Sequence, residues 1–231
     1  MPSKKKSICV TLIGALSLAS AFAQQVDLSE INAGYKDPNL VVDVWVDRLE
    51  SEGREAFDFR EQIADAIGLE PGMAVADVGA GTGLYTPLLA ARVGSRGRVY
   101  AVDIVPKFID HIRTQAAARG LAQVTAILGT DVSTNLPSAS ADVVFVCDAY
   151  HHFEDYNAML ESIHDALKPG GTLVIVDFER IEGVTSESRL QHVRASKDLV
   201  TSEIEANGFR FTDEVDIEGM KETFMRRFER T

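Results

Sequence analysis

Residues 75–83 read Val-Ala-Asp-Val-Gly-Ala-Gly-Thr-Gly, and this stretch determines the fold that the rest of the chain can adopt. Its first half is apolar, as in a strand buried on both faces, and ends at Asp77 and Val78. Glycines at every second position from Gly79 to Gly83 permit a tight turn and a close approach by a ligand. A helical pattern begins directly afterwards. Strand, glycine turn and helix in this order are typical of the nucleotide-binding edge of a doubly wound α/β sheet.

The spacing of the glycines narrows the kind of nucleotide site. A dinucleotide-binding fingerprint needs a glycine three positions after Gly81, where the chain has Leu84. The loop also lacks the Gly-Lys pair followed by Ser or Thr that defines a P-loop. A nucleotide-dependent oxidoreductase is therefore a weaker alternative, and a P-loop is not indicated.

Short apolar segments alternate with helical ones along the rest of the chain. The predicted strands are 74–78, 99–102, 124–128, 143–147 and 173–176, and the predicted helices between them are 84–93, 106–119 and 156–167. This alternation predicts a parallel sheet with helices on both faces.

The C-terminal part departs from that alternation. Residues 188–206 predict one long helix that ends at Asn207-Gly208. Segments 209–217 and 222–228 predict an antiparallel hairpin at one sheet edge. The expected fold is thus a doubly wound, mostly parallel, seven-stranded Rossmann-like sheet with an antiparallel C-terminal hairpin, in one domain that spans residues 70–231.

Residues 24–69 form a different region. Residues 24–39 are polar and aperiodic, which predicts a leader or loop, whereas 40–49 and 57–67 have helical periodicity. We expect a helical N-terminal cap that could cover a cleft.

The first 23 residues have the pattern of a secretory signal. Lys4, Lys5 and Lys6 precede an apolar run over 8–19, and Ala21-Phe22-Ala23 is the small-x-small pattern that signal peptidase recognises. The run is short of the roughly 20 residues that span a bilayer. We predict a signal peptide of residues 1–23, cleaved after Ala23, a periplasmic or secreted protein, and no stable membrane association after cleavage. An uncleaved N-terminal membrane anchor is the alternative.

Charge and cysteine content limit the partners. The chain has 23 Lys and Arg against 35 Asp and Glu, a net charge of −12, so the basic surface of a nucleic-acid binder is missing. Cys9 lies in the predicted signal, so the remainder keeps only Cys147, which we interpret as buried packing, and can form no internal disulfide. We predict a small-molecule substrate and no nucleic acid, and the sequence leaves the oligomeric state open.

Taken together, these motifs resemble the class I S-adenosylmethionine-dependent methyltransferases, with the strongest similarity over residues 60–180. Besides the glycine stretch, the matching motifs are Val99–Asp103, Gly129–Val132, Asp142–Asp148 and Leu167–Leu173. The resemblance implies that S-adenosylmethionine is bound as methyl donor. It implies cofactor contacts at Asp77, Gly79, Gly81, Gly83, Asp103, Asp131 and Asp148.

Three roles follow from this resemblance. The glycine loop would wrap the methionine part of the cofactor, Asp103 would accept hydrogen bonds from the ribose hydroxyls, and Asp131 would contact the adenine amino group. A carboxylate at a strand end does offer two acceptors to a vicinal diol. The alternative is that the glycines are steric and that the acids only start turns.

His151 and His152 follow the fourth predicted strand, where substrates of such folds lie. Either could take a proton from the acceptor, since the ordinary pKa of histidine is near 6.5, and we name both as catalytic candidates. Adjacent histidines cannot face the same way, so one should enter the cleft while the other packs or hydrogen-bonds. A role in shaping the pocket is the alternative.

A metal site is a further interpretation of this pair, with Asp148 and Glu154 as added ligands. It lacks a third histidine nearby in sequence. His192 could approach in space, but we interpret it as an exposed helix residue and predict no metal. Arg180, Arg189 and Arg194 could hold an acidic substrate, although exposed ion pairs are the simpler interpretation.

The sequence thus predicts a methyltransferase that acts on a small-molecule acceptor and is exported from the cytoplasm. The alternative is a secreted, non-catalytic binding or sensor module that retains the fold. That alternative is motivated by the predicted signal, because the cofactor is made in the cytoplasm.

Overall fold

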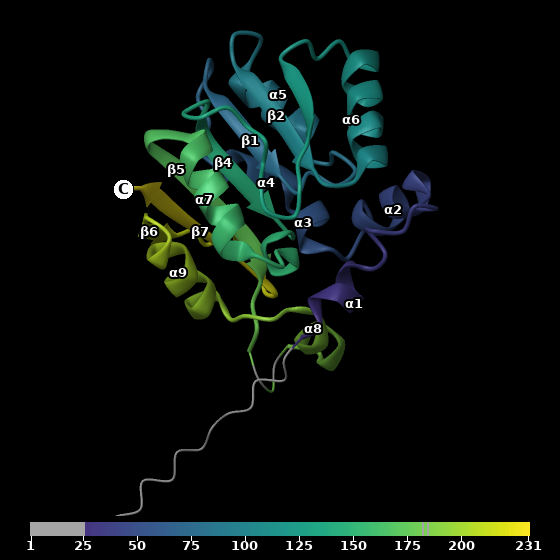
Figure 1. Cartoon of the computed structure of the whole chain (residues 1–231), viewed down its shortest axis with the longest axis vertical. Helices are drawn as coiled ribbons and strands as arrows, with labels where there is room; N and C mark the ends of the chain where they lie inside the picture. Colours follow the sequence, from purple (N-terminus) through teal and green to yellow (C-terminus); the bar gives the residue numbers. More distant parts are fainter. Residues whose placement is uncertain (1–25, 182, 184) are drawn as a thin grey trace, which may run out of the picture.

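A computed structural model describes residues 26–231 apart from 182 and 184 (Figure 1). The predicted signal peptide, residues 1–23, lies outside the described residues. Over the part that is described, no helix combines the length and the apolar character needed to cross a membrane.

Seven strands form one sheet in the order β3-β2-β1-β4-β5-β7-β6 (Figure 1). Neighbouring strands from β3 to β5 are parallel, whereas β7 runs antiparallel to both β5 and β6. The strands are β1 Ala74–Val78, β2 Arg98–Asp103, β3 Val124–Leu128, β4 Ala141–Cys147, β5 Leu167–Phe178, β6 Phe209–Glu214 and β7 Thr223–Arg230. The predicted fold class is confirmed, including the C-terminal hairpin.

The strand order reverses at β1. From this strand the chain proceeds through β2 and β3 on one side and through β4 and β5 on the other. Loops that leave β1 and β4 therefore diverge, and they open a crevice at the carboxyl ends of these strands.

Helices cover both faces of the sheet, and α1, α2 and α8 lie beyond the carboxyl ends of its strands (Figure 1). They are α1 Leu28–Asn32, α2 Val42–Leu49, α3 Glu55–Asp58, α4 Arg60–Ala66, α5 Thr86–Val93, α6 Pro106–Ala118, α7 Tyr156–Ala166, α8 Glu187–His192, α9 Lys197–Ala206 and the short 3₁₀ helix η1 Tyr150–His152. In β1, Ala76 and Val78 pack into the core beneath α7 and α9, whereas Val75 packs into the core beneath α4 and α5. The alternation of side chains along a strand accounts for this division.

The N-terminal region is more helical than its sequence predicts. Residues 24–39 were expected to be a leader or loop, yet α1 forms within them because the Asp27 side chain caps it by accepting from the Ser29 N–H. In α2, Trp45 is buried against Tyr35 and Phe108.

Glu55, at the start of α3, ties this region to the last hairpin. Its carboxylate accepts hydrogen bonds from the backbone N–H groups of Lys221, Glu222 and Thr223, at 2.6–3.1 Å, and from the Thr223 hydroxyl at 2.7 Å. Charge-assisted bonds of this kind are stronger than neutral ones. These bonds therefore attach the region before β1 to the residues that lead into β7.

The prediction of one long helix over 188–206 is wrong. The structure has two helices, and the backbone is extended at Val193. Val193 and Ala195 enter the core with 2% and 4% exposure, and Ser196 caps α9 through its side chain. Burial of two alternate apolar residues favours an extended segment over a continuous helix.

A smaller difference concerns the start of β5. The sequence predicts helix up to Leu167 and strand from 173, but α7 ends at Ala166 and Leu167 already pairs with Ala141 of β4. The register then shifts before Val143 pairs with Thr172. The Lys-Pro-Gly-Gly sequence lies within this irregularity, which is where strands tolerate proline and glycine.

Candidate active site

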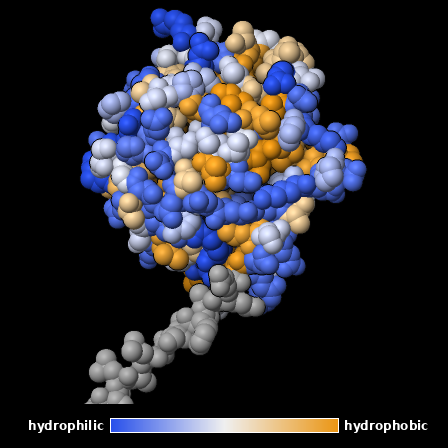
Figure 2. All heavy atoms as spheres, viewed as in Figure 1, coloured by the Kyte–Doolittle hydropathy of each residue, from blue (hydrophilic) through white to orange (hydrophobic). Residues whose placement is uncertain are grey.

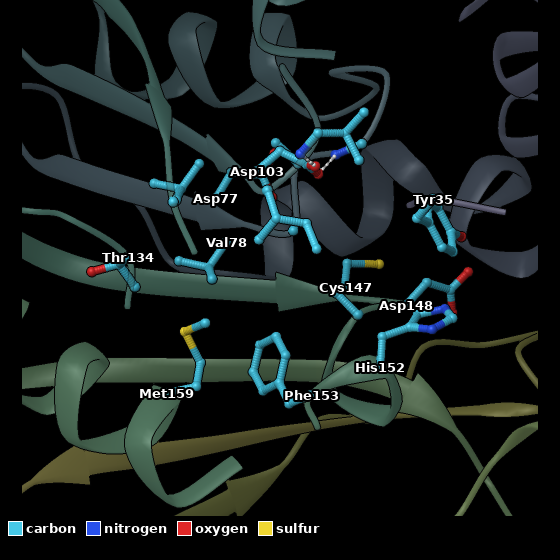
Figure 3. Close-up of a pocket in the computed structure, with 18 of the residues that line it drawn as sticks. Tyr35, Asp77, Val78, Asp103, Thr134, Cys147, Asp148, His152, Phe153 and Met159 are labelled. Carbon is cyan, nitrogen blue, oxygen red and sulfur yellow. Dashed lines mark hydrogen bonds between the residues drawn. The ribbon is translucent and has the colours of Figure 1, made fainter. Parts of the chain in front are cut away.

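A pocket of about 1120 Å³, its open mouth included, lies at the carboxyl ends of β1, β2 and β4 (Figure 3). Its walls come from the loops after these strands and from the N-terminal cap. On the face shown in Figure 2, hydrophobic residues gather in the middle and are ringed by hydrophilic ones. An apolar cavity with a few polar groups at a strand switch point is the usual setting of a ligand site.

The glycine loop forms one wall. Gly79, Gly81 and Gly83 all have positive φ, at 82°, 55° and 88°. At Gly79 a Cβ atom would lie only 2.4 Å from the Cβ of Ala149. Both a left-handed backbone and lack of space therefore require glycine at this position.

Asp103 holds this loop in place from the end of β2. Its two carboxylate oxygens accept 2.8 Å hydrogen bonds from the backbone N–H groups of Gly81 and Val105. Burial raises its pKa to about 6, although the backbone hydrogen bonds oppose that shift. Asp103 also lines the pocket, and a carboxylate has lone pairs left to accept from two further hydroxyls.

Asp77, at the end of β1, is buried, and no positively charged side chain pairs with it among the described residues. Its Oδ2 atom has no hydrogen-bond partner among the described residues. Burial, followed by the negative charge of Asp103, raises its pKa to about 7. A buried carboxylate without a partner is costly, and a positively charged ligand in the pocket would relieve that cost.

Asp148 follows β4 and lines the pocket near Tyr35 and His152 (Figure 3). It has an unusual positive φ of 51°. Its Oδ2 atom pairs with Arg54 Nη2 at 2.6 Å, while Oδ1 is buried and has no partner among the described residues. Burial raises the pKa of Asp148, and the Arg54 charge counteracts this.

Arg54 is a pocket residue that the sequence did not reveal. It lies in the turn before α3 and reaches an acid 94 positions away. The sequence around Asp148 does not indicate which residue pairs with it, and a single arginine in a polar segment does not by itself predict a place in a pocket. Asn32 and Tyr35 of the N-terminal cap line the pocket as well and were missed for the same reason.

Asp131 is the most exposed of the predicted cofactor residues. It lines the pocket, but 53% of its side chain is accessible, and its Oδ1 atom lies 3.4 Å from Lys36 Nζ. All seven predicted cofactor residues except Gly83 are among those that line the pocket. Gly83 lies on the outer side of the loop, where a Cβ atom would meet Ile112 at 2.9 Å.

His152 lines the pocket and His151 does not. The expectation that the two face different ways is nevertheless wrong, because their ring centroids lie only 4.1 Å apart. The Nδ1 atom of His152 lies 2.7 Å from Asn32 Oδ1. Burial, and then the neighbouring histidine and arginine charges, lowers the pKa of His152 to about 2. A base works best with a pKa near the working pH, so this environment suits a neutral ring that positions ligands.

His151 is 4% exposed and hydrogen-bonds to Asp177 of β5. Its Nδ1 atom lies 2.7 Å from Asp177 Oδ1, and its backbone N–H donates to Oδ2 at 3.0 Å. Burial lowers the pKa of His151, but the charge and hydrogen bond of Asp177 outweigh it, so the pKa lies above the ordinary value.

The interpretation of His192 as an exposed helix residue is wrong. It is half-buried at the end of α8, and its ring centroid lies 5.0 Å from that of His151 and 5.2 Å from that of His152. Burial lowers its pKa to about 4. The end of α8 at the extended Val193 places it there.

The remaining candidate residues, Asp148, Glu154 and Cys147, form contacts with other side chains of the protein. Asp148 pairs with Arg54, and Glu154 accepts from Lys36 at 2.7 Å, so neither acid joins the histidines. Cys147 is buried and donates to the Tyr85 hydroxyl, as interpreted.

The three arginines after β5 make internal contacts and are not among the pocket-lining residues. Arg180 donates to backbone carbonyls, Arg189 pairs with Glu222, and Arg194 pairs with Glu203 through both of its terminal nitrogens. Only Arg189 has the partly exposed ion pair that the sequence suggested for all three.

Residues 76–175 match a family model described as a methyltransferase domain. Over these residues the chain contains a methyltransferase domain, and its fold is that of solved S-adenosylmethionine-dependent methyltransferases. A demethylmenaquinone methyltransferase of Geobacillus stearothermophilus is 29% identical over 124 residues, which cover 54% of this chain and 53% of that protein. The chain thus spans about half the length of this curated relative.

Solved structures show the same fold over a longer range. A SAM-dependent methyltransferase from Aquifex aeolicus has a TM-score of 0.71 at 24% identity, covering 90% of this chain and 100% of that one. The [4+2]-cyclase SpnF has a TM-score of 0.66 at 16% identity, covering 78% and 84%. The fold is therefore shared by proteins with different activities.

Proposed function

We propose that this protein transfers the methyl group of S-adenosylmethionine to a small-molecule acceptor. The observation that carries the proposal is the pocket in which Asp77, Asp103 and the glycine loop meet. The uncompensated Asp77 carboxylate fits a ligand with a positive charge, and Asp103 fits a diol. The relative's name gives demethylmenaquinone as its acceptor, and a largely apolar pocket is compatible with an acceptor of that kind.

The chain contributes mainly binding and orientation in this proposal. S-adenosylmethionine supplies an already activated methyl group on a sulfonium, so alignment of the two reactants is the main requirement. Asp103 orders the glycine loop through Gly81, and Tyr35 of the cap covers the pocket beside His152. The Arg54–Asp148 pair and His152 form the polar end at which an acceptor would be oriented.

Calorimetric titration with S-adenosylhomocysteine, followed by a turnover assay with labelled S-adenosylmethionine over a panel of small acceptors, tests the proposal. We expect binding and transfer of label to at least one acceptor. No binding at millimolar ligand would refute the cofactor site. Binding without transfer to any acceptor would instead favour the non-catalytic binding module.

Binding of S-adenosylhomocysteine should depend on pH because of Asp77. With a pKa of about 7 in the free protein, this carboxyl is mostly protonated at pH 6 and ionised at pH 8. The ligand's ammonium group favours the ionised form, so binding lowers the pKa and releases a proton. Affinity should therefore fall about tenfold from pH 8 to pH 6.

Calorimetry in buffers of different ionisation enthalpy measures that proton release. Asp77→Asn is the control, because it keeps the shape and cannot titrate; most of the pH dependence should disappear in it. An unchanged slope in this variant would assign the dependence to another group, of which Asp103 is the first candidate.

We also propose that the protein acts outside the cytoplasm. The support is the sequence pattern of residues 1–23, with its basic start, apolar run and Ala-Phe-Ala end. Fractionation of the source cells with mass determination of the N-terminus tests this. A chain that starts at Gln24 in the periplasmic or secreted fraction is the expected result, and an intact N-terminus in the cytoplasm would contradict it.

A further inference from the structure

Three imidazole rings meet beside the pocket, although they come from two distant segments. His151 and His152 belong to η1 after β4, and His192 ends α8. One ring nitrogen of each lies within 4.8 Å of those of the other two. The chain has five histidines, and three of them gather here.

The neighbours of two of these rings fix which nitrogen carries the proton. At His151, the Asp177 carboxylate can only accept, so Nδ1 is the donor at 2.7 Å. At His152, the Asn32 amide nitrogen already donates to the His152 carbonyl and to Glu154. The Asn32 oxygen is thus the acceptor from His152 Nδ1. In its neutral form, each of these two rings therefore has a free lone pair on Nε2.

A ring whose Nδ1–H donates to a carboxylate or an amide oxygen is the usual form of a metal-binding histidine. The partner fixes the orientation of the ring and increases the basicity of the free nitrogen. The ring centroids lie 4.1 Å apart for His151 and His152, and 5.0 and 5.2 Å from His192. Three imidazoles on one zinc ion at about 2.0–2.1 Å have centroids roughly 5 Å apart, so modest ring rotations would complete the geometry.

We propose that His151, His152 and His192 bind one divalent cation of the zinc type. Three histidines without a carboxylate ligand favour zinc and its neighbours over magnesium or calcium, which prefer oxygen. Three protein ligands also leave a coordination position open, as in catalytic zinc sites.

The charges around the cluster partly balance such a cation. Asp177 is buried and contacts His151 directly. Arg54 and Arg48 lie close enough to act on the His152 ring and oppose a positive ion, but Arg54 is neutralised by Asp148 at 2.6 Å. Asp177 therefore provides the nearest compensating charge.

The position of the cluster gives the cation a role in acceptor binding. His152 belongs both to the cluster and to the pocket wall. This role, unlike the cation site itself, rests on the proposed methyl transfer. An acceptor R–XH on the cation would lose its proton to water, X would bond to the methyl carbon, and the carbon–sulfur bond would break with its electron pair left on sulfur.

Metal titration of the full chain tests the site directly. The protein is stripped with a chelator and titrated with Zn²⁺ against a competing indicator, and with Co²⁺ to record visible absorption bands. We expect one equivalent of Zn²⁺ and Co²⁺ bands of a low-coordinate nitrogen site. His192→Gln should weaken Zn²⁺ binding at least about 100-fold, and Asp177→Asn about 10–100-fold.

His111→Gln is the matched control, since His111 lies on α6 away from the cluster, and it should bind Zn²⁺ like the unaltered protein. Equal binding by the His192 and His111 variants, or no stoichiometric binding by the unaltered chain, would overturn the proposal. Circular dichroism checks that each variant is folded, and His192 is chosen because it is only half-buried. S-adenosylhomocysteine titration of the same samples separates the two proposals, because the cofactor site can bind while the cation site fails.

Discussion

Asp103→Ala should reduce the affinity for S-adenosylhomocysteine about 100-fold, equivalent to about 2.7 kcal/mol. The substitution removes the proposed acceptor of the ribose hydroxyls. It also leaves the N–H groups of Gly81 and Val105 without their acceptor, because both donate 2.8 Å hydrogen bonds to the Asp103 carboxylate. Hydrogen bonds to a charged group contribute about 1.5–3 kcal/mol each. Loss of the ribose contact together with a looser glycine loop is therefore sufficient for a change of this size.

Asp131→Ala is the matched control for that experiment. It removes a carboxylate from the same pocket, but one with 53% of its side chain exposed and only a 3.4 Å approach to Lys36. A loss of less than about tenfold is expected, because exposed contacts are screened by water. Calorimetry of both variants at one pH measures the two effects. Unchanged affinity in Asp103→Ala would refute the ribose role, and a larger loss in Asp131→Ala would reverse the assignment of the main anchor.

Gly79→Ala should lower the free energy of unfolding by about 2–5 kcal/mol and also abolish measurable binding of S-adenosylhomocysteine. The left-handed backbone, with φ of 82°, costs an alanine about 1–2 kcal/mol. The new methyl group would lie 2.4 Å from the Ala149 Cβ atom, and overpacking of this kind costs about 1–3 kcal/mol more. Urea denaturation measures the sum.

Two further variants separate the backbone cost from the clash. Gly120 has φ of 66° and open space around it, so Gly120→Ala should cost only the first 1–2 kcal/mol. In the double variant Gly79→Ala with Ala149→Gly, the clashing atom is gone, and much of the excess loss should be recovered. Equal destabilisation by the Gly79 and Gly120 substitutions would show that the contact with Ala149 has no energetic weight.

The parts of the fold that were predicted correctly depend on local pattern. The secondary structure of residues 75–83 can be predicted from these residues alone, because a buried strand and a glycine turn are each recognisable within a few residues. Asp103 could be placed at the pocket for a related reason: the carboxyl ends of adjacent parallel strands meet at one edge of the sheet.

The parts that were missed depend on contacts between distant residues. The Arg54–Asp148 pair and the Asn32–His152 contact join positions 94 and 120 residues apart, and no periodicity reports such a pairing. His192 was misplaced because helix propensity alone continues through residues 188–206. In the structure, tertiary burial of Val193 and Ala195 overrides that propensity. The same interruption brings the third histidine to the other two.

The contact of Glu55 with the Lys221–Thr223 backbone has a consequence for the order of folding. It joins residues 166 positions apart, and a contact over such a separation is costly to form before the intervening chain is ordered. The segment that carries Arg54 beside the pocket is thus held by a hairpin 166 positions further along the chain. The carboxyl ends of β1, β2 and β4 form the floor of the pocket, whereas the position of Arg54 beside it depends on the C-terminal hairpin.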